Sequence, residues 1–489
     1  MFHAINSEVE SNHAIKFAII GARTHTMYKL SPHWHKQLKL SAKPAYLLIA
    51  DLIAEGIERG QLTARDRLPP LRDLAIDLEL NYTTVARAYA EARKRGLIDS
   101  HAGMGTFVRG RTPSLPLRAG GSAEMTMNLP PEIEDPLLLG RLRESAAAVL
   151  SSSDIHSLLR YQDFGGTPAD RAAGALWLRQ CLPACRAELV MVCPGIQSAL
   201  VALISQLARP GELICVESLT YPGIKAIAAQ LGVRLHALPL DGEGPSAHAF
   251  EEACKTLEPK ALYCNPTLLN PTTMTVTPKR REALVDVALR YAVPIIEDDA
   301  YAMLPRQMPA PMATLAPALT YYVTGFSKCL GAGLRAAYIY SPGLRHAERV
   351  AGALRATTVM ASPITNRLAT QWINDGTAGA MLQAIRKESM ARQEIAARRL
   401  AGYEYHAQPE GFHLWLPLPG ETNVPDFAAH LRAQGVGVVS SAAFSTDGDP
   451  PPAVRVSLGG PINRDQCDAA LHLLGDSLAA PQGMHTRVM

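Results

Sequence analysis

Ser327 and Lys328 form a pair that could carry covalent chemistry. They follow the apolar run Tyr321–Val323 and precede a glycine-rich turn that ends at Arg335. A lysine bonds to an aldehyde only after it has lost its proton, and partial burial favours that loss. An arginine beyond the turn could hold a phosphate in its planar fork. Because a lone Ser-Lys pair is also ordinary on a protein surface, the assignment depends on three other segments.

The second segment is acidic. Three consecutive carboxylates, residues 297–299, follow the apolar pair 295–296 and precede Tyr301. A carboxylate at the C-terminal end of a buried strand lies where α/β sheets bind ligands. Pyridoxal phosphate needs such a group against its ring nitrogen to keep the ring protonated. The alternative is an acidic loop in contact with solvent.

The third and fourth segments could bind the rest of such a cofactor. Asn270 could donate a hydrogen bond to the phenolate oxygen of the ring, although Asn-Pro is also an ordinary turn. The Pro-Gly pair at 194–195 opens a helix whose free backbone amides, at Ile196 and Gln197, could receive the phosphate. Tyr221 could stack on the ring.

Short β-rich runs alternate with helical segments through most of the chain. The runs are Leu213–Glu217, Ala261–Cys264, Val293–Glu297 and Thr320–Thr324. This alternation predicts an α/β fold with a mainly parallel sheet covered by helices. The chain has 489 residues, of which 47% are hydrophobic, which suffices for a large core and more than one domain.

Composition argues against several classes of protein. No apolar run reaches the length of a membrane span, so we expect no membrane association. The eight cysteines include no Cys-x-x-Cys, and no histidine pair stands at ligand spacing. We therefore expect reduced thiols, a cytoplasmic location and no metal site. The net charge of +3 is too small to identify a partner.

The N-terminal region has a different pattern. Helical spacing of apolar residues predicts helices at 45–60, 70–80 and 82–95, the last with Asn81 as its N-cap. Two short strands follow within Leu97–Val108, around a glycine-rich turn. Three helices and a hairpin are typical of a winged helix-turn-helix, whose third helix reads DNA.

The charge of this region supports DNA binding only weakly. Between Ser41 and Thr112, eleven lysines and arginines stand against nine acidic residues. Electrostatic attraction to phosphates would therefore be modest. On pattern alone, a small helical accessory domain is the alternative.

Motifs in this region resemble the GntR family of winged-helix regulators. The motifs are Arg67–Ala75 (RLPPLRDLA), Tyr82–Tyr89 (YTTVARAY), Gly96–Ile98 (GLI) and Gly103–Val108 (GMGTFV). They cover the predicted domain in the correct order. The DNA contacts that the resemblance implies are Arg67, Arg72, Tyr82, Thr83, Thr84 and Arg87, with Gly103 and Gly105 in the wing.

The remainder resembles the fold-type I aminotransferases, from about Met127 to the end. The motifs are Tyr161–Pro168, Pro194–Leu200, Asn265–Thr272, Ile295–Tyr301 and Ser327-Lys328, with Gly411–Leu416 and Val454–Ser457 in a small C-terminal subdomain. The resemblance implies that Lys328 bonds to pyridoxal phosphate, Asp298 holds its pyridinium and Arg455 grips a substrate carboxylate. The other cofactor contacts that it implies are Ile196, Gln197, Tyr221, Asn270, Tyr301, Ser327 and Arg335, with Tyr161 reaching the phosphate of the partner subunit.

Four positions depart from the aminotransferase pattern. Gly325 stands where the family usually has a serine, which removes one hydroxyl for the phosphate. Thr273 replaces a usual glycine, Ala332 a usual proline and Asp170 a usual leucine. None of these changes alters the lysine, the aspartate or the arginine. They bear on cofactor affinity and catalytic rate more than on cofactor binding itself.

The two halves, joined in this order, resemble the MocR subgroup of GntR regulators. We therefore expect a pyridoxal-phosphate-dependent transcriptional regulator that binds operator DNA as a homodimer and senses an amino compound or pyridoxal phosphate. The alternative is an active aminotransferase with an accessory N-terminal domain. The expected parts are a poorly ordered extension at 1–40, a winged helix-turn-helix at 41–110, a linker at 111–126 and an aminotransferase-like domain at 127–489.

Overall fold

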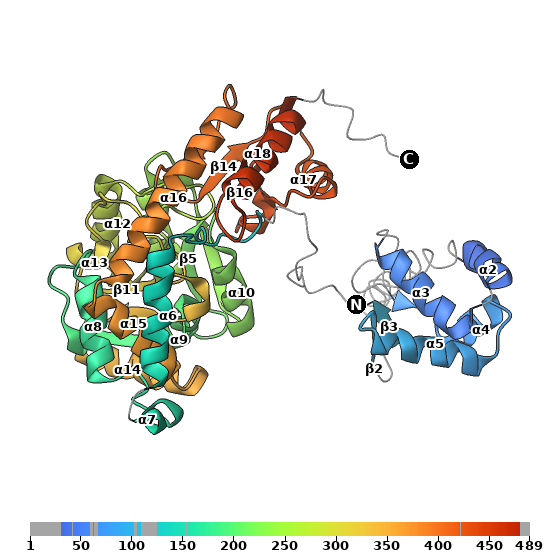
Figure 1. Cartoon of the computed structure of the whole chain (residues 1–489), viewed down its shortest axis with the longest axis horizontal. Coiled ribbons are helices and arrows are strands. Elements are labelled where there is room, and N and C mark those ends of the chain that lie inside the picture. The colour runs from blue at the N-terminus through green and yellow to red at the C-terminus, as the bar shows by residue number, and fades with distance from the viewer. Residues whose placement is uncertain are drawn as a thin grey trace, which may run out of the picture. The chain divides into compact units, whose positions relative to one another are not determined.

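The computed structural model describes residues 31–41, 43–58, 62, 67–101, 105–108, 125–151, 154–420 and 422–479. The chain divides into two compact units, Met1–Ala119 and Gly120–Met489 (Figure 1). Within the described ranges, no helix is both long and apolar enough to cross a lipid bilayer, and no group of side chains is arranged to hold a metal ion.

The N-terminal unit is a winged helix-turn-helix. Its elements are α2 (Ser31–Leu40), α3 (Ala45–Glu58), β1 (Arg67–Leu68), α4 (Leu71–Asp77), α5 (Tyr82–Lys94), β2 (Ile98–His101) and β3 (Gly105–Val108). Helices α3 and α4 pack on α5, and β3 lies between β1 and β2, antiparallel to both. The helices and the hairpin confirm the predicted fold. Strand β1 was not predicted, because two residues are too few to show an alternating pattern.

Helix α2 corrects our expectation of a poorly ordered extension over 1–40. Residues 1–30 of the predicted extension, and residues 111–124 of the predicted linker at 111–126, lie outside the described ranges. Within α2, the side chain of Trp34 is only 3% exposed and belongs to the core of the unit. A ring nitrogen of His35 lies 2.5 Å from the carbonyl oxygen of Asp77, the last residue of α4. Burial of a large indole explains why this segment folds onto the domain.

The C-terminal unit is built on a seven-stranded sheet. In spatial order the strands are β4 (Val190–Cys193), β12 (Ala337–Tyr340), β11 (Thr320–Gly325), β10 (Ile295–Asp298), β9 (Ala261–Cys264), β5 (Leu213–Glu217) and β6 (Arg234–Leu238). Strands β11, β10, β9, β5 and β6 are parallel, whereas β12 is antiparallel to both β11 and β4. This arrangement confirms the mainly parallel sheet. Strand β10 begins after Pro294, later than predicted, because proline has no N–H for the ladder.

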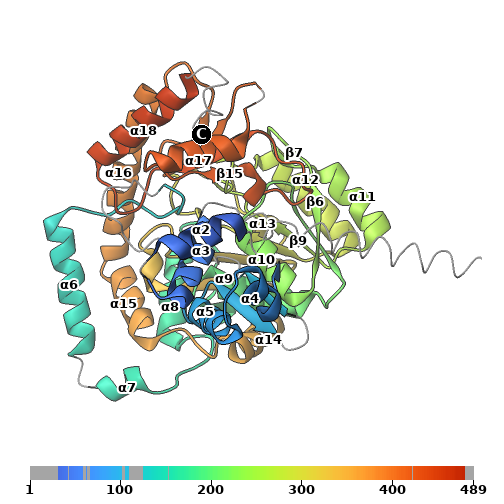
Figure 2. The ribbon, with the colours of Figure 1, turned by 90° about the vertical axis from the view of Figure 1, so that its right-hand side faces the viewer.

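Helices cover both faces of this sheet. The helices of the unit before the small subdomain are α6 (Pro136–Leu150), α7 (Ile155–Leu159), α8 (Pro168–Leu178), α9 (Ile196–Leu207), α10 (Pro222–Leu231), α11 (Ala247–Leu257), α12 (Pro278–Tyr291), α13 (Met312–Leu315), α14 (Leu344–Thr357), α15 (Pro363–Asn374) and α16 (Thr377–Arg399). Two successive residues of β4 show the two layers: Val192 packs in the core with α8 and α15, and Met191 packs in the core with α9 and α14. Helices α6, α15 and α16 lie side by side at one edge (Figure 2). A short hairpin, β7 (Leu240–Asp241) with β8 (Gly244–Pro245), lies outside this sheet.

A small C-terminal subdomain adds an antiparallel sheet. Its strands in spatial order are β13 (His406–Ala407), β14 (His413–Pro417), β16 (Ala453–Ser457) and β15 (Val439–Ser440), and its helices are α17 (Val424–Ala433) and α18 (Arg464–Ala479). Met125 is fully buried in its core, and the carbonyl of Met125 accepts the N–H of Ser457 at 2.9 Å. The packed part of this unit therefore includes Met125, two residues before the predicted start at Met127.

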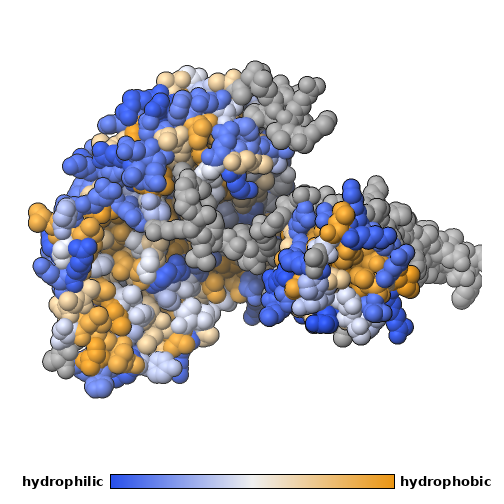
Figure 3. Space-filling view, turned by 45° about the vertical axis from the view of Figure 1, so that its right-hand side comes forward, coloured by the Kyte–Doolittle hydropathy of each residue, from blue (hydrophilic) through white to orange (hydrophobic). Residues whose placement is uncertain are grey.

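Apolar side chains gather at the end of the C-terminal unit where α7 lies (Figure 3). Leu150 is 54% exposed, Leu159 71% and Tyr161 78%. Scattered apolar side chains are normal on a protein surface, but a cluster of large ones is typical of a protein–protein contact.

Candidate functional site

Three polar residues meet at the carboxyl edge of the parallel sheet. Glu217 ends β5, Asn265 follows β9 and Asp298 ends β10. Asn265 connects the other two, because its backbone N–H donates to the carboxylate of Glu217 at 2.5 Å and its side-chain amide donates to the carbonyl of Asp298 at 2.5 Å. Neighbouring parallel strands thus bring together residues that are far apart in the sequence, at the edge where α/β folds bind ligands.

The carboxylate of Asp298 is buried and only half satisfied. Its Oδ2 accepts a hydrogen bond from the hydroxyl of Tyr263 at 2.8 Å, whereas Oδ1 has no partner among the described residues. Burial raises the pKa of Asp298 to about 7, and the neighbouring Asp299 and Glu217 add to the rise. An unpartnered buried oxygen is costly. A protonated ring nitrogen would satisfy it and lower the pKa again, so this residue fits the pyridinium of pyridoxal phosphate.

The two neighbouring carboxylates serve other contacts. The guanidinium of Arg281 lies 3.5 Å from Glu297, and both side chains are fully buried. The same carboxylate accepts the first backbone N–H groups of α13, at 2.9 and 2.8 Å. The carboxylate of Asp299 accepts from the hydroxyl of Tyr322 at 3.2 Å. Successive side chains of a strand point to opposite faces. Of the three consecutive carboxylates, Asp298 is therefore the one that lies on the face where Tyr263 donates its hydrogen bond.

Lys328 lies after β11, next to this edge, and is half-buried. Its Nζ donates to the backbone carbonyl of Asn128 and lies 5.7 Å from the ring centre of Tyr301. Burial, together with the nearby Arg455, lowers the pKa of Lys328 to about 8, and Asp298 acts in the opposite direction. A larger fraction of this amine is therefore neutral near physiological pH than for an ordinary lysine, as bonding to an aldehyde requires.

Tyr301 and Asn270 lie near this lysine. The hydroxyl of Tyr301 accepts from the side-chain amide of Asn128 at 2.8 Å, and its ring packs on His413 with the ring centres 5.6 Å apart. The side-chain oxygen of Asn270 accepts from Arg455 at 2.8 Å. The amide NH₂ of Asn270 is then the group that could donate to a ligand oxygen.

Arg455 is the buried cation of the site. It is 6% exposed, in the middle of β16. One arm of its guanidinium bonds to Asn270, another to the carbonyl of Thr126, and its Nε has no partner among the described residues. No described carboxylate pairs with it, so a ligand carboxylate is the complement that its planar fork lacks.

The start of α9 and the turn before β12 form an anion cradle. Gly195 precedes α9 with φ of 95°, and a Cβ at this position would lie 2.9 Å from the guanidinium of Arg335. Only glycine therefore permits this approach. The backbone amides of Ile196 and Gln197 lie in the first turn of α9, where they have no intrahelical partner. Together with an exposed arginine, they suit a phosphate.

Tyr221 stands between the two ends of the site. It is half-buried and precedes α10 as its N-cap residue. Burial raises the pKa of Tyr221, the charge of Asp298 adds to the rise, and the charge of Arg335 opposes it. A Cβ on Gly223 would lie 2.2 Å from the ring of Tyr221, so glycine is needed for this ring position. An aromatic ring near both the carboxylate and the arginine suits stacking on a cofactor.

The winged helix presents a separate set of exposed groups. Tyr82, Thr83 and Arg87 are exposed along α5, Thr84 is half-buried, and Arg72 is exposed on α4. Asn81 occupies the N-cap of α5, but its side chain makes no capping hydrogen bond. The first turn of α5 thus offers hydroxyl and amide groups together with a cation one turn on, which suit DNA contacts.

Two of the predicted DNA-contacting arginines are held by neighbours. The guanidinium of Arg87 lies 4.4 Å from the ring centre of Tyr46, on α3. Arg67 in β1 covers the start of β3, since a Cβ on Gly105 would lie 2.8 Å from its Nε. By contrast, Arg95 is paired with Asp51 and does not contribute a free cation.

Each of the two units matches a known protein family. Residues 135–474 match the family described as Aminotransferase class I and II, and residues 45–108 match Bacterial regulatory proteins, gntR family. The chain belongs to the aminotransferase class I and II family. Its gntR-type region precedes the aminotransferase region, which is the domain order of the MocR subgroup.

Relatives with regulatory names cover most of the chain. The HTH-type transcriptional regulator YdeF of Bacillus subtilis is 27% identical over 447 residues, 90% of this chain and 96% of the relative. The vitamin B6 salvage pathway transcriptional repressor PtsJ of Salmonella typhimurium is 27% identical over 84% of this chain and 93% of its own. A 2-aminoadipate transaminase of Thermus thermophilus is 25% identical over 68% of this chain and 85% of its own.

A solved structure shares the fold of the aminotransferase-like unit. The alpha-aminoadipate aminotransferase LysN of Thermus thermophilus has a TM-score of 0.66 at 23% identity, covering 74% of this chain and 92% of its own.

Some predicted residues are not brought together, and others were missed. Tyr161 is exposed in the connection between α7 and α8, and Gly103 lies outside the described residues. Sequence reasoning missed Asn128, Tyr263 and His413. Tyr263 could have been found, because it lies on the strand that leads to the Asn-Pro segment. Asn128 follows a linker-like region and His413 lies on an apolar strand, so neither carried a signal.

Replacing Arg455 with Met should raise the pKa of Lys328 from about 8 toward its ordinary 10.5, because removal of a nearby cation favours the protonated amine. Asp298→Asn should shift it in the opposite direction. The measurement is the pH dependence of Lys328 acetylation in the cofactor-free protein, read by peptide mass spectrometry. Equal midpoints in the three proteins would contradict this electrostatic account.

Tyr46→Leu should weaken binding to the operator about 2- to 5-fold, the loss expected from one exposed cation–π contact. Tyr46→Phe keeps the ring and should bind as the parent does. In an Arg87→Ala background, Tyr46→Leu should cause no further loss, because the two residues act through one contact. Additive losses in a fluorescence-anisotropy titration would show that Tyr46 acts independently of Arg87.

Proposed function

We propose that the chain is a DNA-binding transcriptional regulator that holds pyridoxal phosphate on Lys328. One observation carries the proposal: a gntR-type region shares a chain with a cofactor-type site in which Asp298 has a free buried oxygen. The regulatory names of relatives that span both units support it. The proposed DNA contacts are Arg67, Arg72, Tyr82, Thr83, Thr84 and Arg87, with Gly103 and Gly105.

Each end of the site would bind one part of the cofactor. Bound pyridoxal phosphate supplies an aldehyde that bonds to amines and a ring that withdraws electrons. Lys328 would bond to the aldehyde carbon, and Asp298 would hold the proton on the ring nitrogen. Tyr301 and Asn270 would contact the phenolate oxygen, and Tyr221 the ring face. The phosphate would be held by Ile196, Gln197, Ser327 and Arg335.

The effector would be an amino compound or pyridoxal phosphate itself. An amino compound would compete with Lys328 for the aldehyde. Arg455 would favour compounds that also carry a carboxylate, because no described carboxylate neutralises it. A ligand that binds two conformations of the protein unequally shifts their populations, and that shift would change DNA binding.

We further propose that the protein works in the cytoplasm as a homodimer. The exposed apolar side chains near α7 would be covered by a second copy, and Tyr161 would reach the phosphate in the partner. In gel filtration at micromolar concentration the chain should elute as a dimer, and Leu159→Glu should shift it toward monomer. Elution of the parent as a monomer would contradict the proposal.

The decisive experiment measures DNA binding and cofactor binding in one preparation. The protein should prefer its own upstream DNA to random DNA, with an affinity that falls as salt rises. Pyridoxal phosphate should give a visible absorption band that Lys328→Ala abolishes. Equal affinity for both DNAs would refute the proposed regulatory function. An unchanged absorption band in Lys328→Ala would refute the proposal that Lys328 binds the cofactor.

A working aminotransferase is the second candidate, favoured by the lowered pKa of Lys328 and the unneutralised Arg455. It is distinguished by a steady-state assay with amino donors and a keto acid. Turnover of about 1 s⁻¹ or more, without sequence-selective DNA binding, would support the enzyme.

A further inference from the structure

Residues 125–131, here called the strap, form the first described segment of the C-terminal unit. Its two ends are tied to the small subdomain. The carbonyl of Met125 accepts from the backbone of Ser457 at 2.9 Å, and the carbonyl of Pro130 accepts from Gly460 at 3.2 Å. A Cβ on Gly459 would overlap the carbonyl oxygen of Leu129, at 1.7 Å, so the strap packs directly on the backbone there.

The middle of the strap contacts the cofactor-type site. The carbonyl of Thr126 accepts from the guanidinium of Arg455, and the carbonyl of Asn128 accepts from Nζ of Lys328. The side chain of Asn128 donates to the hydroxyl of Tyr301 at 2.8 Å. The strap therefore connects the small subdomain, through Arg455, with the large sheet, through Lys328 and Tyr301.

The donors that hold the strap are also the groups that a ligand needs. When the nitrogen of Lys328 bonds to an aldehyde carbon, water leaves and the nitrogen gives up the hydrogens that it could donate. The carbonyl of Asn128 then loses its partner. When Arg455 turns its fork to a ligand carboxylate, the carbonyl of Thr126 competes with a charged acceptor, which forms the stronger hydrogen bond. Ligand binding and the strap contacts therefore oppose each other.

We propose that the strap is a ligand-responsive part of this site, held by Lys328 and Arg455, and that it is loosened at Asn128 when pyridoxal phosphate bonds to Lys328 and at Thr126 when a ligand carboxylate binds Arg455. This inference rests on the proposed cofactor function of Lys328. An amino compound that takes the aldehyde from Lys328 returns the free amine, which can donate to Asn128 again. An α-amino acid differs from a simple amine because its carboxylate draws Arg455 away from the carbonyl of Thr126. In the sequence, residues 109–124 connect the winged helix to the strap.

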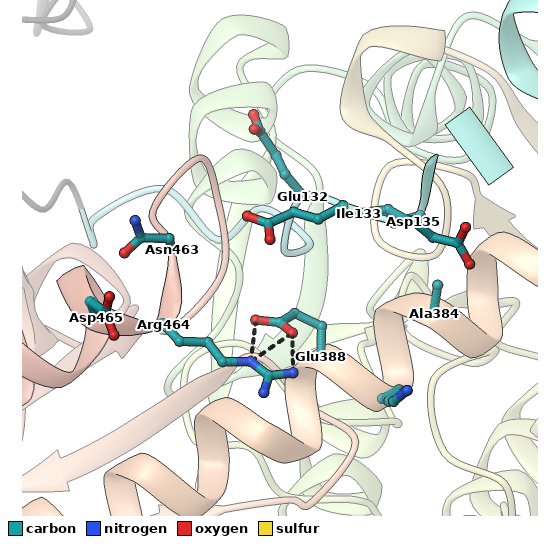
Figure 4. Close-up of a pocket in the computed structure, with 10 residues that line it drawn as sticks. Glu132, Ile133, Asp135, Ala384, Glu388, Asn463, Arg464 and Asp465 are labelled. Atoms are coloured by element: carbon teal, nitrogen blue, oxygen red, sulfur yellow. Dashed lines mark hydrogen bonds and ion pairs between the residues drawn. The ribbon is translucent and has the colours of Figure 1, made fainter. Parts of the chain in front are cut away.

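The segment that follows the strap borders a cavity on one side. Residues 132–135 line a cavity of about 580 Å³ together with residues of α16 and the start of α18 (Figure 4). The opposite wall is fixed, because Glu388 is paired with Arg464 at 2.8 Å and with Arg392 at 2.8 Å. The buried side chain of Met125 anchors one end of the strap, whereas the segment that follows its other end borders open space.

Hydrogen exchange of the full-length protein tests the strap, with pyridoxal phosphate as the probe. Loss of one or two hydrogen bonds should speed exchange of amides 126–129 about 5- to 30-fold in the loaded parent. Lys328→Met should show this faster exchange without the probe. Lys328→Arg keeps a donor but cannot bond to the aldehyde, so its exchange should stay slow with and without the probe. Peptides from α11 serve as the internal control.

Visible absorption and circular dichroism of the same samples separate the outcomes. A cofactor band in the folded parent with unchanged exchange at 126–129 would overturn the strap while the cofactor assignment stands. Absence of the band would refute the proposed cofactor function. The strap would then be judged on the cofactor-free proteins, where equal exchange in the parent and in both Lys328 variants would overturn it. If Lys328→Met does not fold, the comparison of the loaded parent with Lys328→Arg decides whether the strap responds to the cofactor.

Discussion

The half-satisfied carboxylate of Asp298 is the constraint on which the rest of the site depends. Its Oδ2 is fixed by Tyr263, and its Oδ1 is buried without a partner. Keeping such a group at a strand end requires neighbours that hold the backbone, and Asn265 and Glu217 do so from the adjacent parallel strands. Burial is the main cause of the pKa shifts of Lys328 and Tyr221, and the charge of Asp298 acts on both groups.

Much of this arrangement could be predicted from the sequence. Strands β5 and β9 were found with their observed bounds, because their continuous apolar runs have no other reasonable place than a covered sheet. The order of the motifs around Lys328, Asp298 and Asn270 sufficed to group residues that the fold places near one another. What pattern alone could not decide was which of three consecutive carboxylates faces the site, since that depends on the pleat of β10.

The remainder could not be predicted because its signals are not local. Asn128 accepts from Lys328 through its backbone carbonyl, which any residue type would provide, and its side chain donates to the hydroxyl of Tyr301 only because the fold brings together residues far apart in the sequence. Trp34 is one aromatic residue in a polar stretch, and only the core formed by α3 to α5 makes its burial favourable. In the N-terminal unit, ion pairs such as Arg95 with Asp51 reduce the cation count that the composition indicates.

The course of Met125–Asn128 also bears on how such a protein can arise. The first packed residues of the aminotransferase-like unit run past Arg455 and Lys328 before the chain enters α6. Any polypeptide fused upstream is thereby joined by its backbone to the functional centre, without a new interface between folded parts. Gene fusion at this end would place a second domain in direct backbone continuity with the residues that contact Arg455 and Lys328.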